Sequence, residues 1–260
     1  MSRYADVHCH LSFPQFHEDR EQVIARLREA GVGLVIDPGT DAETSRRSID
    51  LAASHDFVYA NVGLHPGEVN ARFTPELYDE LAALARKEKV VGIGEIGLDY
   101  HWPDHNPGFQ IDAFREMLRM AAALDLPVAI HCRDAWPDML RVLTEERSSN
   151  LRGMMHCFSG DLDIARQCIG FGLKISVPGT ITYKKSPLPG IVAAVGLPDL
   201  LSETDAPYLS PVPMRGKRNE PANVALTVQA IADARPEPFD AVAQALRNNA
   251  CDLFGIEPAF

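Results

Sequence analysis

The chain has 260 residues, and its 36 acidic against 25 basic side chains leave a formal net charge of −11. That length suits one (β/α)8 barrel of about 250 residues, and a hydrophobic content of 46% excludes a disordered chain. The acidic balance excludes a protein that coats nucleic acid through bulk positive charge, but not an enzyme that binds one phosphate locally.

Cysteine usage and the first residues indicate the compartment. The five cysteines are an odd number without a C-x-x-C pair, so we expect a reducing environment and no disulfide framework. The N-terminus lacks the charged and apolar regions of a signal peptide, and no apolar run approaches the ~20 residues of a membrane span. We therefore expect a cytoplasmic protein with no membrane contact, and no obligate protein partner is evident.

Short apolar runs alternate with stretches of helical periodicity along the chain. In chain order, the expected strands are Tyr4–His8, Val32–Asp37, Phe57–Leu64, Val90–Ile96, Pro127–His131, Gly153–Cys157, Leu173–Val177 and Leu200–Thr204. Their ends are about 28 residues apart on average, which is close to one strand-helix unit. Eight such units without a linker predict a single TIM-barrel domain over residues 1–260; a doubly wound open sheet is the alternative.

The helical stretches carry their own start signals. Thr74 followed by Pro75 has the form of an N-cap and a proline at the first helical position. The periodicity predicts an eighth helix over Pro221–Ala234 and a ninth over Phe239–Phe254. The last of these is an extra C-terminal helix beyond the eight units of the barrel.

Six of the eight strand ends carry a histidine or a carboxylate. In a barrel, these positions converge on the mouth, the end where the C-termini of the strands meet and active sites are built. A lone H-x-H is most simply a pair of hydrogen-bonded core histidines, but buried imidazoles and carboxylates recurring at further strand ends are costly to explain as packing. The candidate metal ligands are His8, His10, Glu95, His131, His156 and Asp205.

Alternation along the strands indicates which side chains face the site. His8 and His10 point the same way, into the barrel, and Cys9 points outward. Cys132 and Cys157 each follow a histidine in the same manner, so we expect all three thiols at the helix–sheet interface. A mixed Cys/His zinc site is therefore not expected.

The ligand set suggests two ions. Four imidazoles and two carboxylates exceed the needs of one tetrahedral ion and suit two divalent ions about 4 Å apart with Glu95 between them. Such ions would clamp a phosphoryl or carbonyl oxygen and lower the pKa of a water, with Asp205 placed to accept its proton. Imidazole-rich ligation suits Zn, Mn, Co or Ni, whereas Mg prefers oxygen ligands; we expect Mg, Mn or Zn and leave the identity of the metal open.

Residues 92–97 spell G-x-G-x-x-G, the dinucleotide-binding pattern. Dinucleotide binding requires a helix that begins directly after the glycines, yet an irregular segment with Pro103 follows. The glycines are better explained by close backbone packing around Glu95.

Basic residues gather where barrels usually bind phosphate, after strands seven and eight. Arginine can bind phosphate oxygens bidentately, whereas lysine acts as a point charge. Arg133, two residues beyond His131, should also sit at the mouth. Trp102 and Tyr100 follow the Glu95 strand and could stack on a base, with packing in the core or a loop as the alternative. The candidate substrate-binding cations are Arg133, Lys184, Arg215, Lys217 and Arg218, with Lys185 beside them.

The motifs together resemble one family. An early H-x-H, then G-L-H-P, G-E-I-G-L-D-Y, H-C-R-D, H-C-F-S-G, E-T-D-A-P-Y-L and P-V-P-x-R-G-K-R-N-E-P occur in this order. This series is similar to that of the TatD family of metal-dependent deoxyribonucleases, within the amidohydrolase superfamily. The resemblance runs from His8 to the terminal helix and covers nearly the whole chain.

The resemblance implies a TIM barrel, a two-metal centre and hydrolysis of DNA, often as a 3′→5′ exonuclease on single strands. It maps the six ligands above onto the metal centre, with Glu95 and Asp205 also catalytic. It makes His65 an active-site histidine, and Asp99 and Arg133 residues of the mouth that contact or orient substrate. Met214 and His101 depart from the usual His and Tyr of the family, which bears on substrate preference and not on the metals.

Two other functions fit the same residues. The site could cleave an ester or amide bond, as in D-aminoacyl-tRNA deacylation by some family members, although the basic loops favour a phosphate-bearing substrate. A non-catalytic metal-binding scaffold is the other alternative, and the presence of a suitable residue at all six ligand positions argues against it.

Overall fold

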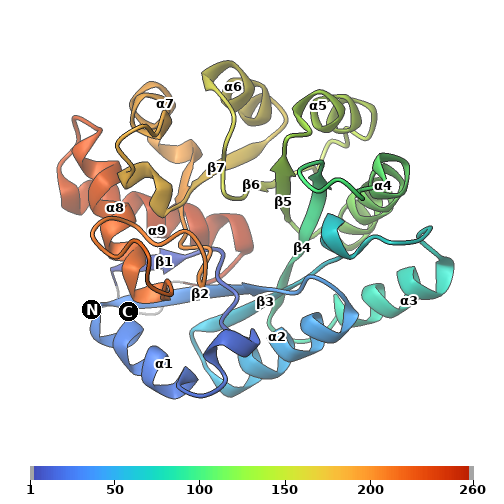
Figure 1. Ribbon diagram of the computed structural model, residues 1–260, viewed down its shortest axis with the longest axis horizontal. Helices are drawn as coiled ribbons and strands as arrows, with labels where there is room; N and C mark the ends of the chain where they lie inside the picture. The colour runs from blue at the N-terminus through green and yellow to red at the C-terminus, as the bar shows by residue number, and fades with distance from the viewer. Residues whose placement is uncertain (1–2, 258–260) are drawn as a thin grey trace.

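The computed structural model describes residues 3–257 and contains eight parallel strands in one sheet, ordered β1 to β8. The five remaining positions, at both ends of the range expected for the domain, lie outside the described residues. Helices surround the sheet, as Figure 1 shows. The strands are β1 (Tyr4–Asp6), β2 (Val32–Pro38), β3 (Val58–Val62), β4 (Val90–Asp99), β5 (Val128–Arg133), β6 (Gly153–Met155), β7 (Leu173–Val177) and β8 (Leu200–Ser202).

Beyond the paired strands, hydrogen bonds close the sheet into a barrel. The Val7 amide donates to the Ser202 carbonyl (3.2 Å), and the Asp205 amide donates to the His8 carbonyl (2.9 Å). The first and last strands are thereby joined, which confirms the (β/α)8 barrel and excludes the open sheet.

The helices follow the strands in alternation, and none within residues 3–257 is long and apolar enough to cross a membrane. Thr74 caps α3 by accepting a hydrogen bond from the Leu77 amide, as its sequence predicted. The helices are α1 (Arg20–Glu29), α2 (Ala42–Ser54), α3 (Pro75–Leu84), α4 (Pro107–Leu124), α5 (Trp136–Glu145), α6 (Leu162–Gly170), α7 (Leu188–Ala194), α8 (Val224–Asp233) and α9 (Phe239–Phe254).

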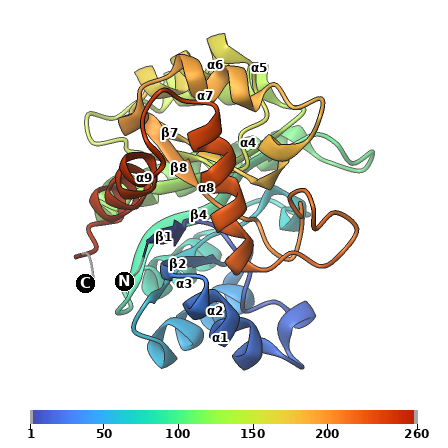
Figure 2. The same cartoon turned by 90° about the vertical axis from the view of Figure 1, so that its left-hand side faces the viewer.

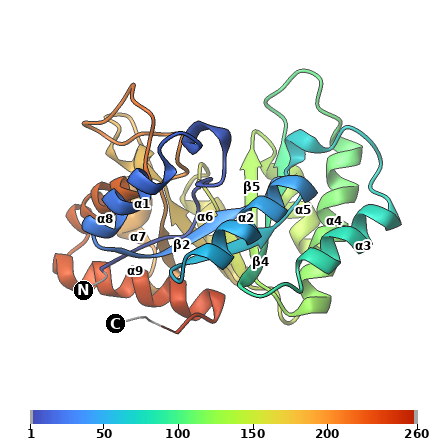
Figure 3. The same cartoon turned by 90° about the horizontal axis from the view of Figure 1, so that it is seen from below.

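The predicted extra helix, α9, closes the end of the barrel opposite the mouth. It lies beside α8 on one flank (Figure 2) and runs across the bottom in Figure 3. Leu253 and Phe254 of α9 pack in one apolar cluster with Val7 and Ile36, which face the barrel interior. Apolar packing thus fills the lower barrel and leaves the polar strand ends at the mouth.

The C-terminal ends of six strands differ from the prediction by two or three residues: β3 and β6 end two residues early, and β5 ends two residues late. β1 and β8 also each end two residues early, so His8 lies just beyond its strand. β4 instead continues three residues further, to Asp99, and the G-x-G-x-x-G segment lies wholly within it. A dinucleotide loop is therefore not formed there, because no helix opens until Pro107.

Candidate metal centre

Glu95 lies at the centre of the mouth, with histidines on both of its oxygens. Nε2 of His8 and of His10 lie 3.4 and 3.6 Å from Oε2. On the other side, Nδ1 of His131 lies 2.9 Å and Nε2 of His156 lies 3.1 Å from Oε1. The carboxylate therefore stands between two sets of imidazoles, the arrangement that a bridging ligand requires.

Asp205, the second carboxylate, approaches from the end of β8. Its Oδ1 lies 3.5 Å from Nε2 of His10 and 3.9 Å from Nε2 of His8. Ligand atoms of His8, His156 and Asp205 also lie within 4.8 Å of one another. All six side chains expected as ligands thus converge, from five different strand ends.

The backbone around Glu95 explains how a strand presents this side chain. The pairing of β4 with β5 is irregular between Ile93 and Ile96, and such irregularities re-aim side chains beside active sites. Gly63 allows the close approach of β3, because a Cβ there would lie 2.4 Å from the Glu95 nitrogen. Gly97 has φ +141°, a conformation that side chains disfavour.

The charges at the centre are mutually adjusted. Burial opposes ionisation of Glu95, but the surrounding histidines, His65 and His156 foremost, hold its pKa well below the usual value. Burial, reinforced by His156, lowers the pKa of His8 to about 3, so its imidazole is neutral at pH 7. A charged carboxylate beside a neutral imidazole is the protonation state in which both can ligate a cation.

The buried nitrogens of His8 test whether a metal fits. His8 is fully buried, yet neither ring nitrogen meets a hydrogen-bond partner within the described chain, and Nδ1 of His10 is likewise unpaired. Unsatisfied buried polar atoms are costly, and coordination to a cation through Nε2 would satisfy one nitrogen of the His8 ring. Together with the carboxylates, these donors fit divalent metal ions.

His65 stands beside the centre in a different state. Its Nε2 lies 3.5 Å from Oε1 of Glu95. Its Nδ1 accepts a hydrogen bond from the Gly67 amide (2.9 Å), so the proton of the neutral ring is on Nε2. Burial lowers the pKa of His65 to about 4, despite the opposing charge of Glu95. A neutral Nε2–H is a donor and not a metal ligand.

Two further carboxyl groups face the outer sides of the ligand histidines. Oδ2 of Asp99 lies 3.2 Å from Nε2 of His131, and Oε1 of Glu203 lies 3.2 Å from Nδ1 of His156. A carboxylate behind a ligating imidazole sets its tautomer and orientation. We expected Asp99 to contact or orient substrate at the mouth, whereas the structure buries it beneath His131.

The sequence reasoning assigned Glu203 no role. Its carboxyl group is fully buried and accepts hydrogen bonds from the Cys157 amide (2.7 Å) and the Ser176 hydroxyl (2.5 Å). The available signal was its position two residues before Asp205, which places both on one side of an extended chain. That spacing resembles His8 and His10, which follow β1, the strand joined to β8 where the barrel closes.

The prediction that three thiols lie at the helix–sheet interface is correct for Cys9 and Cys132 and wrong for Cys157. Cys9 and Cys132 are buried in apolar clusters at the helix–sheet interface. Cys157 is instead part of the mouth, where burial and the carboxylates of Asp205 and Glu203 raise the pKa of its thiol. The reason is that β6 ends at Met155, and Cys157 adopts a left-handed φ of +46°, so strand alternation no longer applies.

The predicted substrate-binding cations differ in availability. Arg133, Lys184 and Lys217 are exposed, and the exposed Arg215 guanidinium stacks 4.3 Å over the ring of Tyr183. Arg218 is different because it forms a bidentate ion pair with Asp19, at 2.8 and 2.6 Å. Contact between Arg218 and a phosphate would require this pair to open.

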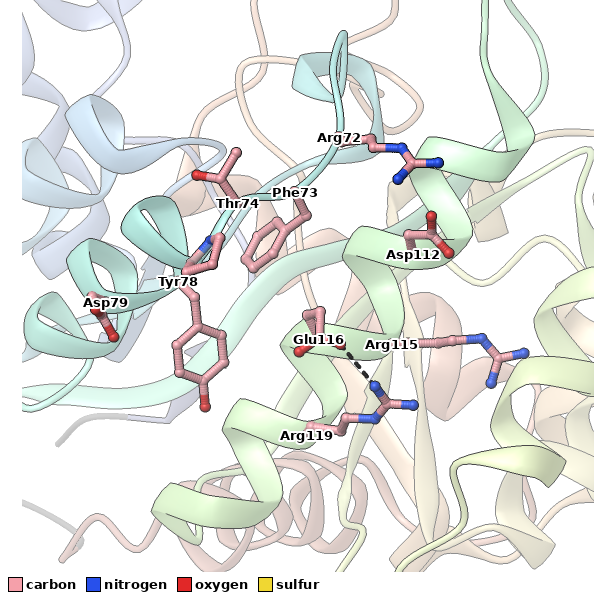
Figure 4. Close-up of a pocket in the computed structure, with 10 residues that line it drawn as sticks. Arg72, Phe73, Thr74, Tyr78, Asp79, Asp112, Arg115, Glu116 and Arg119 are labelled. Carbon is pink, nitrogen blue, oxygen red and sulfur yellow. Dashed lines mark hydrogen bonds and ion pairs between the residues drawn. The ribbon is translucent and has the colours of Figure 1, made fainter.

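A separate cleft lies on the outer surface between α3 and α4 (Figure 4). It has a volume of about 670 Å³ and is lined by Phe73, Tyr78 and Arg72, among others. Arg115, also in its wall, is already paired with Glu145 and Glu146. None of the six candidate ligands lines this cleft, so it is distinct from the metal centre.

Comparison with known proteins finds relatives that match over nearly the whole chain. The chain matches the family model described as TatD related DNase over residues 5–255. It is 37% identical over 252 residues to the uncharacterized metal-dependent hydrolase YabD of Bacillus subtilis (strain 168), covering 96% of this chain and 98% of that protein. It is 34% identical over 258 residues to the 3'-5' ssDNA/RNA exonuclease TatD of Erwinia amylovora, covering 96% and 99% respectively.

A solved structure gives the same result. The crystal structure of YJJV, a TatD homologue from Escherichia coli K12, superposes with a TM-score of 0.92 at 37% identity, covering 98% of this chain and 99% of that one. A barrel of this form with such a centre is a metal-dependent hydrolase. The chain belongs to the TatD related DNase family.

Proposed function

We propose that this hydrolase cleaves phosphodiester bonds in single-stranded DNA, as a 3′→5′ exonuclease acting through one barrel domain. The observation that carries the proposal is the Glu95 carboxylate, whose two oxygens face separate sets of histidines. A relative 34% identical over nearly its whole length is named a 3'-5' ssDNA/RNA exonuclease, which supports a nucleic-acid substrate.

The proposed centre holds two divalent ions. His8, His10 and Asp205 would hold one, His131 and His156 the other, with Glu95 shared between them. Bound there, the ions would supply Lewis-acid activation of a water and of a phosphate oxygen. The remaining steps are carried by the protein's own side chains.

Asp205 is placed to accept the proton of the attacking water. Its side chain is 13% exposed, so water reaches it, and its Oδ1 lies beside His8 and His10. Its backbone φ of +53° is unfavourable for a residue other than glycine and occurs typically where function constrains the chain. Arg133 would bind the phosphate, and the neutral Nε2–H of His65 would donate to one of its oxygens.

Substitution of Glu95 tests the proposal. Glu95→Ala should lose bound metal and lower kcat on an end-labelled single-stranded oligonucleotide at least about 10²-fold, because both metal positions lose their shared ligand. Glu88→Gln, an exposed change away from the mouth, is the control. A purified Glu95→Ala that still cleaves DNA with added metal would contradict the assignment.

The same digestion tests substrate and metal. Reactions with Mg, Mn and Zn should give a ladder that shortens from the 3′ end. Turnover of D-aminoacyl-tRNA without cleavage of the oligonucleotide would instead support the ester-hydrolase alternative.

A further inference from the structure

Large exposed apolar side chains gather at the mouth. Within residues 3–257 they are Trp102 (55% exposed), Tyr208 (47%) and Val212 (47%). Trp102 follows β4, whereas Tyr208 and Val212 follow β8. Exposed aromatic side chains confined to one end of a protein, beside a polar site, indicate a binding surface.

Trp102 stands beside the cation best placed for phosphate. The Arg133 guanidinium carbon lies 5.9 Å from the centroid of the Trp102 ring. The His101 ring contacts the indole edge-on at 5.2 Å, and His101 is itself bonded to Asp134 (3.2 Å). One ring is thus flanked by a positive charge that could bind the phosphate of the nucleotide stacked on it.

Tyr208 adjoins the metal centre from the other side. Its ring lies 6.2 Å from that of His10, in an edge-to-face arrangement. Its amide donates to the Asp205 carbonyl (2.9 Å), and its carbonyl accepts from the buried side chain of Asn219 (2.7 Å). The backbone that carries this ring is therefore held firmly against a proposed metal ligand.

The two rings are on opposite sides of the site. β4 and β8 are four strands apart in a closed barrel of eight, which places them across the mouth from each other. The loops after both strands project from the same end of the molecule, at the upper right and upper left of Figure 3. Glu95 lies in β4 and Asp205 lies just beyond β8, so these two proposed ligands come from the same two strands as the loops.

We propose that Trp102 and Tyr208 are two stacking platforms for the bases on either side of the scissile phosphate of a single strand. This inference rests on the proposed nuclease function and specifies how its substrate is held. Every base has a stacking face, so such platforms bind without sequence preference. In a duplex the bases are already stacked and paired, so the platforms would select single-stranded substrates.

Oligonucleotides with an abasic site test the platforms directly. Each of the two nucleotides that flank the scissile phosphate is made abasic in turn, and kcat/KM is compared with that of the intact strand. Stacking is worth about 1–3 kcal/mol per base, so the wild type should lose roughly five- to 150-fold on each abasic strand.

Variants of Trp102 and Tyr208 test which of the two rings stacks on which base. For Trp102→Ala and Tyr208→Ala, the ratio of kcat/KM between intact and matching abasic strands should fall to about one. Trp102→Phe and Tyr208→Phe keep a stacking face and should retain a substantial part of the ratio. Tyr78→Ala, in the outer cleft, is the control and should keep the wild-type ratio.

Binding gives a readout besides cleavage. The chain has two tryptophans, and Trp136 is packed against the core, so stacking on Trp102 should quench fluorescence when a non-hydrolysable phosphorothioate strand binds. Trp102→Phe should abolish that quenching.

Equal cleavage of intact and abasic strands by the wild type would contradict the stacking role of Trp102 and Tyr208, but it would not contradict the proposed nuclease function. Failure of the wild type to cleave DNA at all would overturn both.

Discussion

Glu203 shows how a residue that never meets solvent can govern the metal centre. Its carboxyl group reaches from β8 past Ser176 of β7 to His156, which follows β6. Because the opposite nitrogen of His156 faces Glu95, the carboxyl group behind the ring determines which nitrogen is free to ligate.

Glu203→Gln tests this positioning role. The amide keeps the size of the side chain and can still accept from the Cys157 amide, but it loses the charge behind His156. We expect metal affinity to fall about 10- to 100-fold with little loss of folding stability. Calorimetric titration with Mn²⁺ measures it, against Glu88→Gln as control. An unchanged Kd would assign Glu203 a packing role only.

The histidines also predict how metal binding depends on pH. Burial would lower the pKa of His10, His131 and His156, but the carboxylates beside them outweigh it and raise all three. An imidazole must be neutral to ligate, so these rings must lose protons when metal binds. Metal affinity should therefore rise as the pH is raised above 6.5, the ordinary pKa of histidine.

Proton release checks this prediction. Titrating metal in two buffers that differ in ionisation enthalpy should give different apparent binding enthalpies, because protons pass to the buffer. Equal enthalpies in both buffers would mean that the rings are already neutral.

Among the elements, β4 has a backbone that strongly restricts which residue can occupy position 97. A Cβ on Gly97 would lie 2.0 Å from the carbonyl oxygen of His131 on β5, and its φ of +141° is unfavourable for any side chain. Gly97→Ala should lower the free energy of unfolding by at least about 2 kcal/mol and displace His131.

Thermal unfolding and metal stoichiometry measure both effects. Gly190→Ala on α7 is a matched control, since nothing lies within 4 Å of the added methyl group and Tm should hold or rise slightly. If Gly97→Ala unfolds at the wild-type temperature, the close approach of β4 and β5 is not a constraint.

The sequence was informative about elements and less so about their last residues. Apolar runs place all eight strands, and the bounds of α9 agree with the prediction, because burial imposes a periodicity that a single chain reveals. The C-terminal ends of six strands, β1, β3, β4, β5, β6 and β8, were misjudged by two or three residues, and the pairing of β4 with β5 is irregular.

The same limit explains the site. The six candidate ligands could be named because each follows an apolar strand. The positions of Glu203 and Asp99 behind the ligand histidines could not be predicted from the sequence, because their contacts with His156 and His131 join different strands. Cys157 was misplaced because its left-handed φ breaks the alternation on which the inference depended.

At the scale of the whole molecule, a net charge of −11 must coexist with an anionic substrate. The exposed cations near the mouth that are free of the Asp19 ion pair include Arg133, Lys184, Arg215 and Lys217. Bulk attraction is therefore absent, and binding should depend on those few contacts together with the metals.

The salt dependence of oligonucleotide binding measures the number of these phosphate contacts. Each phosphate contact on a single strand contributes about 0.7 to the slope of log K against log salt, so four contacts predict a slope no steeper than about −3. Without metal, affinity for a single-stranded oligonucleotide should be weak even at low salt, because the acidic surface repels the rest of the strand. Fluorescence anisotropy with and without chelator tests both statements. A much steeper slope would require a basic surface that extends well beyond the mouth, and the enzyme would then hold its substrate along the strand instead of at its end.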